Sequence, residues 1–410
     1  LHDALPISGL WAQTKVNLSL QECETAFQKN NMLLLASRYG IDEKRALVLQ
    51  AKKWDNPYFS AEFNAINPDA GRYLDVGSQG QKVFAIEQLI KLGGKIKNQV
   101  EIAKKHVHLA EAEYNDLIRN LQFSLRTSYY SAYYDLQTLA NIDKQLASLD
   151  TLIKSYKKQV EKGNISLKDL VRLQALYLET QNEWTSLRNE IISEQENISA
   201  ITGIDSLIVP LRDSIDLKNF QSKADLTYDN LATLALTNRP DLKAYEEWLK
   251  IGEQNVKLQK SNALPDLTLG ANYDQRGGAF NNQINMTLGV PLPIYNQNKA
   301  GIQAAKNAEL SAKAMMEQKS NEIKAEVQGV VRRYKITLDN YQKLSTQILD
   351  NYDIISKSIF ENFQKQNITL IEFTDFIESY TKSLVEINRV KKSLAIICEE
   401  INYITATKVF

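Results

Sequence analysis

The chain has 410 residues, enough for two ordinary domains. Lysine and arginine together number 49, and so do aspartate and glutamate, so the formal net charge is zero. This balance excludes the basic excess by which a nucleic-acid partner usually shows itself. Only 16 glycines and 8 prolines occur, which predicts long, uninterrupted elements.

Residues 1–17 are interpreted as a leader. The chain begins with Leu1 rather than methionine, and residues 7–13 are typical of the end of a signal peptide. A disordered leader is the alternative. No later run approaches the roughly 20 apolar residues of a membrane helix, so this chain would have to cross a membrane as a β-barrel.

A helix and two strands are predicted after the leader. The helix covers residues 19–52, with Ser19 as the N-cap and Glu22 completing a capping box. Pro57 ends this segment. Aromatic, partly alternating residues then predict strands at about 58–66 and about 76–90, joined by a turn at 67–71.

A long helical hairpin follows, over about 94–202. No glycine or proline occurs between Gly94 and Gly163, and an unbroken helix of that length would measure about 100 Å. Its later part carries apolar residues at alternating spacings of three and four, the coiled-coil pattern. The Gly163–Asn164 turn interrupts this pattern, which resumes from Leu170 and predicts an antiparallel partner helix.

The second half of the chain repeats the first. Pro57 matches Pro265, an offset of 265 − 57 = 208, and Lys162 in the turn segment matches Lys365, an offset of 365 − 162 = 203. Shifting the coiled-coil positions of the first half by 203 again gives mostly apolar residues. Internal repeats of this kind indicate a duplicated structural unit.

The repeat defines the expected domains and fold class. The first repeat covers 18–205 and the second 206–410, with strands at about 266–275 and 283–292 and a helical hairpin at about 300–407. Each unit consists of a short helix, a β-hairpin and a long coiled-coil hairpin, so the predicted class is mainly α with a β portion.

The predicted strands alternate between apolar and small or polar residues over about ten positions. This is the period of a barrel strand with lipid on one side and water on the other. Two hairpins cannot close a barrel, and copies of the same chain are the simplest source of further strands.

At this point the sequence resembles the TolC family of outer-membrane efflux factors, from about Leu18 to Thr407. Glu161–Leu170 resembles the hairpin-tip motif, and residues 364–373 repeat it with Gln366 in place of glycine. Asn238–Leu242 resembles the short-helix signature of the family. Val290–Ile302 is similar to the strand-to-helix passage of the heavy-metal cation efflux branch.

The resemblance implies a homotrimer that forms a joint α-barrel and β-barrel duct. It implies a β-barrel in contact with outer-membrane lipid, to which each protomer supplies four strands, and a large periplasmic tunnel of helices in a Gram-negative cell. It also implies two protein partners, a periplasmic adaptor and an inner-membrane efflux transporter. No nucleic acid and no cofactor are expected.

Acidic residues near the second turn are candidates for a periplasmic gate. The i, i+3 spacing of Glu372 and Asp375 puts both on one helix face. In the family, acids at these positions form a ring that narrows the pore and attracts cations. In the first half Asp169 is retained, but Arg172 stands where Asp375 would be. An ordinary solvated helix face is the alternative.

The two hairpin tips are where the resemblance places adaptor docking. The residues concerned are Gly163, Asn164, Ile165, Ser166, Gln366, Asn367, Ile368 and Thr369.

No catalytic or metal-binding pattern is found, so the chain is predicted not to be an enzyme. His106 and His108 are at i, i+2 and point to different sides of a helix, a poor arrangement for chelation. Cys23 and Cys398 are isolated and read as structural, although a disulfide between them is possible in an oxidising compartment.

The predicted function is that of a passive exit duct in a tripartite efflux pump, with metal cations as the expected cargo. The alternative is a periplasmic coiled-coil adaptor or structural protein. Adaptors commonly carry one hairpin, whereas this chain has two with strands at the same place in each half, which favours the duct.

Overall fold

The computed structural model describes residues 15–211, 226–277, 279–344, 355, 358–365 and 367–410. The chain divides into two compact units. Unit 1 contains Leu1–Leu35, Asn115–Arg239 and Asn321–Phe410, and unit 2 contains Ala36–Tyr114 and Pro240–Ser320. Each half of the sequence repeat therefore contributes to both units.

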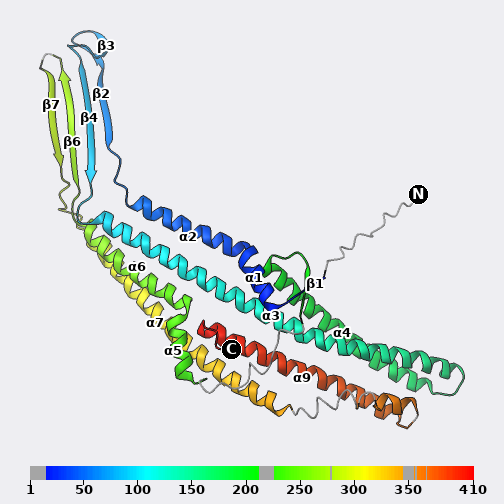
Figure 1. The fold of residues 1–410 in the computed structure, drawn as a ribbon. Coiled ribbons are helices and arrows are strands. Elements are labelled where there is room, and N and C mark those ends of the chain that lie inside the picture. The colour runs from blue at the N-terminus through cyan, green and yellow to red at the C-terminus, as the bar shows by residue number, and fades with distance from the viewer. Residues whose placement is uncertain (1–14, 212–225, 278, 345–354, 356–357, 366) are drawn as a thin grey trace, which may run out of the picture. The chain divides into compact units, whose positions relative to one another are not determined.

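Unit 2 contains a five-stranded antiparallel sheet in the order β3-β2-β4-β6-β7 (Figure 1). The long strands β4 and β6 pair along their whole length, from Gln81 opposite Arg276 to Ile90 opposite Leu267. One strand pair from each half is thus joined into a single sheet. The strands are β2 (Tyr58–Asn67), β3 (Arg72–Asp75), β4 (Gln81–Ile90), β6 (Leu267–Arg276) and β7 (Phe280–Gly289).

The observed strands differ from the expected ones in two places. The expected strand at 76–90 begins only at Gln81, because the Asp75 side chain accepts a hydrogen bond from the Gly77 amide and turns the chain. The expected strand at 283–292 is displaced to Phe280–Gly289. Pro291 and Pro293 lie just beyond it and have no N–H with which to continue the pairing.

The helical segments of unit 2 adjoin one end of this sheet (Figure 1). Lys95 at the start of α3 donates to the Asp266 carboxylate at 2.6 Å and to the Leu264 carbonyl at 2.8 Å. Asp266 also accepts from the Leu92 amide at 3.0 Å. These contacts fix the helix-to-strand junction. The helices that contribute to unit 2 are α2 (Met32–Ala51), α3 (Lys95–Glu161), α6 (Pro240–Asn262) and α7 (Lys299–Lys343).

The helix expected over 19–52 is broken at Asn31. Its predicted capping box is confirmed, since Ser19 and Glu22 bond reciprocally. Asn31, however, is extended, and its side chain donates to the Ile201 carbonyl and accepts from the Leu34 amide. A tertiary contact therefore divides the segment into α1 (Leu20–Asn30) and α2.

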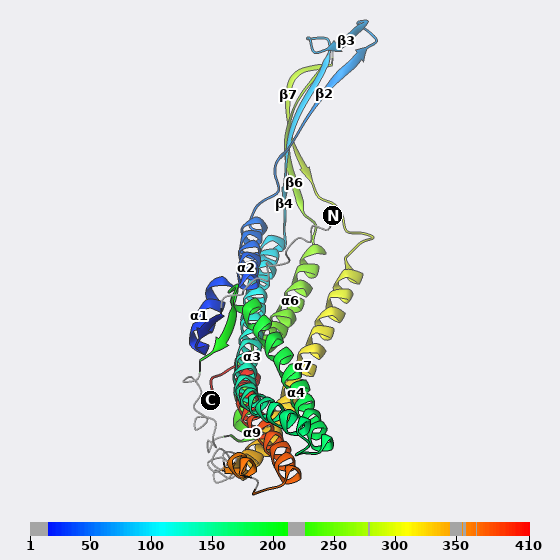
Figure 2. The same cartoon turned by 90° about the vertical axis from the view of Figure 1, so that its right-hand side faces the viewer.

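Unit 1 is built around two long helical hairpins whose tips lie at the same end (Figure 1; turned view in Figure 2). The coiled-coil positions expected from the sequence are buried or half-buried along α4 and α9. The remaining elements of unit 1 are α4 (Leu167–Thr202), α5 (Tyr228–Asn238), α9 (Leu370–Thr405) and a parallel strand pair, β1 (Lys15–Leu18) with β5 (Leu207–Pro210).

Candidate functional site

The two hairpin tips of unit 1 have the same turn geometry. In the first, the Asn164 amide donates to the Gln159 carbonyl at 2.9 Å, and its side chain donates to the Gln159 side chain at 2.8 Å. In the second, Asn367 makes the same two bonds to Asn362, at 2.9 and 3.0 Å. Gly163 has φ +76°, a left-handed conformation that favours glycine. Gln366, at the equivalent place, lies outside the described residues.

The helix that follows each tip is capped differently. In the first tip, the Ser166 hydroxyl accepts from the Lys168 amide at 3.1 Å. In the second, Thr369 and Glu372 form a full capping box, with the Thr369 amide donating to Glu372 at 2.8 Å and the Glu372 amide donating to the Thr369 hydroxyl at 3.2 Å. Aspartate at 169 lacks the methylene that lets a glutamate reach back to the cap.

The capping box lowers the pKa of the gate candidate Glu372. Hydrogen bonds from the backbone N–H and the hydroxyl of Thr369 hold the pKa of the Glu372 carboxyl below its ordinary value. This carboxylate is therefore ionised and fixed in position, and it stabilises the start of α9.

The other gate candidates are less constrained. Asp375 and Arg172 are exposed, and neither makes an ion pair with any described residue. Asp169 is half-buried. Burial and, secondarily, the Asp169 charge raise the pKa of Tyr156, so this carboxylate lies near the apolar packing beneath the tips. A pore ring would need carboxylates from several protomers, so the gate remains a prediction.

An apolar cluster ties the two tips together. Phe363 and Phe373 stack at 4.2 Å between ring centroids, and side chains from both hairpins pack around them. A cavity of about 650 Å³ lies beside this cluster, between α3 and the second hairpin. The buried members of the cluster are Leu149, Leu152, Leu173, Leu176, Phe363, Phe373 and Ile377.

A series of polar contacts continues from the tips along the seam between α3 and α9. Gln145 pairs with Thr381 at 2.6 Å and Thr138 with Asn388 at 2.9 Å.

Two ion pairs extend the seam. Lys392 donates to Asp135 at 2.8 Å, and Arg126 donates to Glu399 at 2.8 Å. Arg126 also donates to Glu24 of α1 at 2.6 Å. Residue numbers fall on α3 as they rise on α9, so the helices run antiparallel in one register. The seam thus joins a helix of the first repeat to a helix of the second.

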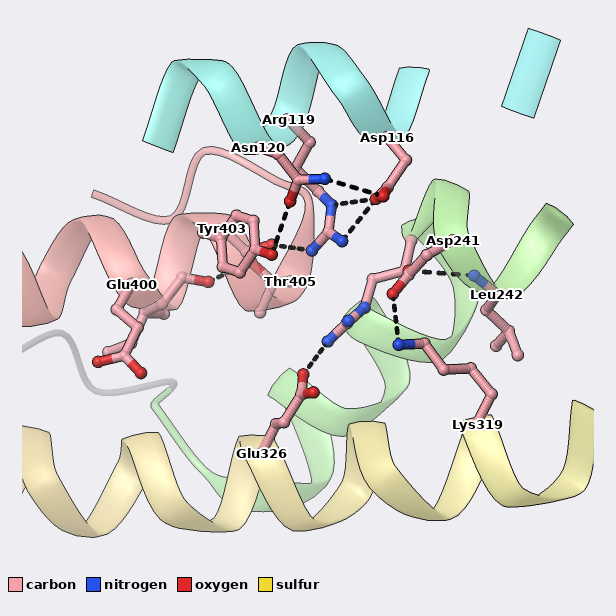
Figure 3. Close-up of polar contacts among 12 residues, drawn as sticks. Asp116, Arg119, Asn120, Asp241, Leu242, Lys319, Glu326, Glu400, Tyr403 and Thr405 are labelled. Carbon is pink, nitrogen blue, oxygen red and sulfur yellow. Dashed lines mark hydrogen bonds and ion pairs between the residues drawn. The ribbon is translucent and has the colours of Figure 1, made fainter. Parts of the chain in front are cut away.

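The Asn238–Leu242 signature has a structural role. Asn238 donates to the Thr407 hydroxyl at 3.0 Å, and the buried Arg239 pairs with Glu326 of α7. These contacts hold the end of α5 against two other segments of unit 1. Within unit 2, Asp241 in the first turn of α6 pairs with Lys319 at 3.0 Å (Figure 3).

Arg119 is a second buried arginine of unit 1, which the sequence analysis did not single out. It lies between Asp116, at 2.6 Å, and the Tyr403 carbonyl, at 3.0 Å (Figure 3). Its guanidinium also covers the Tyr403 ring at 4.2 Å, a favourable cation–π geometry. An arginine within a helical pattern gives no sequence signal that it will be buried.

The sheet of unit 2 has one apolar face and one polar face. Phe84 of β4 packs with Phe59 and Phe63 of β2 and with Tyr273 of β6, at 5.7 to 6.4 Å between ring centroids. The register adds β7 to this face, because Ala271 lies opposite Met286. The opposite face is mainly polar or small, although Val83 and Leu89 of β4 also lie on it. Its other residues include Ser60, Glu62, Ala85, Glu87, Gly270, Asn272, Asn285 and Thr287.

Much of the apolar face is uncovered. Met286 is 91% exposed and Ile284 76% exposed. β7 pairs with β6 alone among the described strands. A sheet with an exposed apolar face and an open edge indicates an incomplete assembly.

The described residues hold no group of three or more His, Cys, Asp or Glu side chains suited to a metal ion. His106 is half-buried and meets the Trp248 ring edge to face. Cys23 and Cys398 are both free and buried. None of the helices in the described part of the chain is both long and apolar enough to cross a membrane.

Comparison with known proteins gives a family match over most of the chain. Residues 26–204 and 231–359 match the family described as outer membrane efflux protein. The nickel-cobalt-cadmium resistance protein NccC of Alcaligenes xylosoxydans xylosoxydans is 20% identical over 269 residues. That alignment covers 65% of this chain and 59% of the relative, so the chain spans less than two thirds of that protein.

Two solved structures share the fold over nearly the whole chain. The CmeC outer membrane channel of Campylobacter jejuni has a TM-score of 0.75 at 14% identity, covering 95% of this chain and 87% of that one. CusC, whose structures concern folding and transmembrane channel formation, has a TM-score of 0.72 at 15% identity, covering 96% and 92%. The arrangement of strands and helical hairpins is therefore the fold of these two channel proteins.

Proposed function

Since the chain belongs to the outer membrane efflux protein family, we propose that it is the outer-membrane channel of a tripartite efflux pump. In this role it is a passive exit duct. An inner-membrane transporter delivers the substrate, and a periplasmic adaptor links the two proteins.

Family membership confirms two predictions from the sequence, the outer membrane as the location and the absence of enzymatic activity. It also favours the channel over the alternative of a periplasmic adaptor.

The observation that carries the proposal is the two-faced sheet of unit 2. One face is apolar and exposed, as contact with lipid requires, and the other is polar, as a water-filled lumen requires. Copies of the chain would pair the open edge of β7 with the part of a neighbour's β2 that precedes its pairing with β3 at Asn64–Asn67. The proposed assembly is a homotrimer whose protomers each add β2, β4, β6 and β7 to one closed barrel.

The tips of unit 1 are the proposed docking site for the adaptor. Both tips lie at one end, share one apolar cluster and present the same asparagine turn. A partner could therefore recognise two similar elements side by side. Glu372, Asp375, Asp169 and Arg172 lie in the first turns beyond the tips and are the proposed gate residues.

Metal cations are the proposed cargo. Support comes from the name of the nickel-cobalt-cadmium resistance protein and from the passage Val290–Ile302, which is similar to that of the heavy-metal branch. A duct needs no tight binding site for what passes through it, and the acids Glu372 and Asp375 beyond the second tip would favour cations.

The experiment deletes the gene in the cell that carries it and measures accumulation of nickel, cobalt and cadmium. The proposal expects all three to accumulate and the intact gene to restore their export. Accumulation of organic compounds alone would refute the cargo but support the duct. Unchanged accumulation of both classes would contradict the duct.

A further inference from the structure

The apolar face of the sheet continues past the end of β7. From Ile284 to Ile294 every second residue is a large apolar side chain or valine, and each is at least 43% exposed. Only the first three belong to the strand. We call the six residues the β7 stripe: Ile284, Met286, Leu288, Val290, Leu292 and Ile294.

The segment that carries the stripe lacks charge. No Asp, Glu, Lys or Arg occurs between Arg276 and Lys299. The corresponding strand and passage of the first half carry Lys82, Glu87 and Lys91. Charged side chains are costly in the hydrocarbon layer. Sheet pairing does not explain why charged residues are also absent beyond the end of β7, whereas contact with lipid does.

The part of the stripe within β7 is too short for a membrane. An extended chain rises about 3.3 Å per residue, so Ile284 to Leu288 spans about 13 Å. The apolar band of an outer-membrane barrel is about 25 Å tall. Beyond β7 the chain stays extended at most to Leu292, because the Ile294 amide donates to the Leu292 carbonyl at 2.9 Å in a tight turn. Ile284 to Leu292 would span up to about 26 Å, so apolar residues beyond the strand are needed to complete the band.

The passage beyond β7 is held in place although its side chains are uncovered. The Asn298 side chain, on a residue at φ +53°, donates to the Gln259 carbonyl at 2.7 Å, and the Asn298 backbone amide donates to the Asn296 side-chain oxygen at 3.0 Å. Tyr295 is fully exposed. A cavity of about 430 Å³ lies between the passage and Lys95 with residues 262–266, and Leu292 and Tyr295 are among the residues that line it. Both side chains nevertheless stay mostly exposed.

We propose that the segment Val290–Tyr295 lies in the phospholipid of the periplasmic leaflet, with Tyr295 at the headgroup boundary. Tyrosine is enriched at such boundaries. Asn296, Gln297 and Asn298 follow in water, and the exposed Lys299 can reach lipid phosphates. The inference rests on the proposed outer-membrane channel and adds to it the place where the membrane ends.

The test measures depth with a spin label on an introduced cysteine, Tyr295→Cys or Leu292→Cys. Cys23 and Cys398 are fully buried, so a thiol-reactive nitroxide labels the introduced site. Lys306→Cys, exposed on α7, is the matched control. The full chain is reconstituted in vesicles of phosphatidylethanolamine and phosphatidylglycerol and exposed to oxygen and to a water-soluble nickel chelate.

The proposal expects the spin label at 292 to collide with oxygen several-fold more often than with the nickel chelate. The label at 295 should collide with the two reagents about equally, and the label at 306 should collide more often with the nickel chelate. Nickel access at 292 equal to that at 306 would place the passage in water and overturn the inference. An immobilised label that neither reagent reaches would mean that a second copy covers the passage, which also overturns it. Failure of the chain to enter vesicles would instead refute the proposed function.

Discussion

The Glu372 carboxylate is held at the start of α9 by the amide and hydroxyl of Thr369, both at 2.8 Å. A capping box satisfies two backbone donors that a helix start otherwise leaves unpaired. Glu372 thus has a structural role whatever its role in the pore. Removing its charge and removing its cap are separate changes, and they need separate variants.

Thr369→Ala is expected to weaken the start of α9 by about 1 kcal/mol, because the hydroxyl that caps the helix is lost. Glu372→Gln keeps a group that can accept from the Thr369 amide and should retain most of the cap. Hydrogen exchange of the amides at 370–373 measures the stability of the start of α9 in both variants. Equal protection in Thr369→Ala and the unchanged protein would contradict the capping role.

The cap should also depend on pH. The folded-state pKa of Glu372 is lowered by the Thr369 hydrogen bonds, so its contribution is fully present above the ordinary glutamate pKa of 4.5 and is lost as pH falls through the folded value. Protection of residues 370–373 should decline over that acid range. Glu372→Gln should show no such decline, and a decline of equal size in that variant would refute the assignment.

The sequence contained the signal for this cap. Thr369 and Glu372 have the same spacing as Ser19 and Glu22, for which the capping box was predicted and confirmed. Arg119 and Arg239 could not be found in this way, because their burial depends on segments far away in the chain.

At the scale of elements, the seam between α3 and α9 joins the two repeats within unit 1. Asp135 and Lys392 have side chains only 9% and 23% exposed. Removing one partner of a buried ion pair leaves the other charge uncompensated. The seam combines such ion pairs with apolar packing beneath the tips. Loss of an ion pair near the middle of the seam should therefore destabilise the packing of both hairpins.

Asp135→Ala is expected to lower the free energy of opening of α9 by about 3 kcal/mol. Glu378→Ala is the control, because it removes an exposed pair with Lys382 on the same helix, and exposed pairs contribute little. Hydrogen exchange of α9 amides reports both changes. If the two variants behave alike, the seam is not a stabilising element.

The elements differ in how well sequence predicts them. The helices and hairpin turns follow from local spacing and from Gly163, and they are observed close to where they were expected. The break at Asn31 and the shifted strand β7 depend on a contact with Ile201 and on pairing with β6. Such long-range partners leave no local pattern.

The two faces of the sheet should respond differently when a residue is replaced by arginine. Leu288 lies near the centre of the β7 stripe, and Thr287 beside it faces the polar side. Arginine at a lipid-facing site near the bilayer centre costs about 2–4 kcal/mol, whereas lumen positions accept charge.

Leu288→Arg should therefore reduce the amount of protein in the outer-membrane fraction, while Thr287→Arg should leave it nearly unchanged. Quantitative blotting of fractionated cells compares the two. The opposite ranking would reverse the assignment of the faces and contradict the proposed lipid contact.

The division into two units was not foreseen, because the sequence repeat suggests two halves that follow one another. Instead, each half supplies strands to unit 2 and a hairpin to unit 1. Pairing of β4 with β6 connects residues far apart in the chain, and no local signal specifies it. The resemblance to a known family supplied what the periodicity alone did not.

The most direct test of the channel proposal is the mass of the particle extracted from the outer membrane in detergent, measured by native mass spectrometry. One chain has a mass of 46.6 kDa. The account predicts a particle of three chains, because the open edges of the sheet need neighbours. A monomer released from the periplasm without detergent would contradict the account.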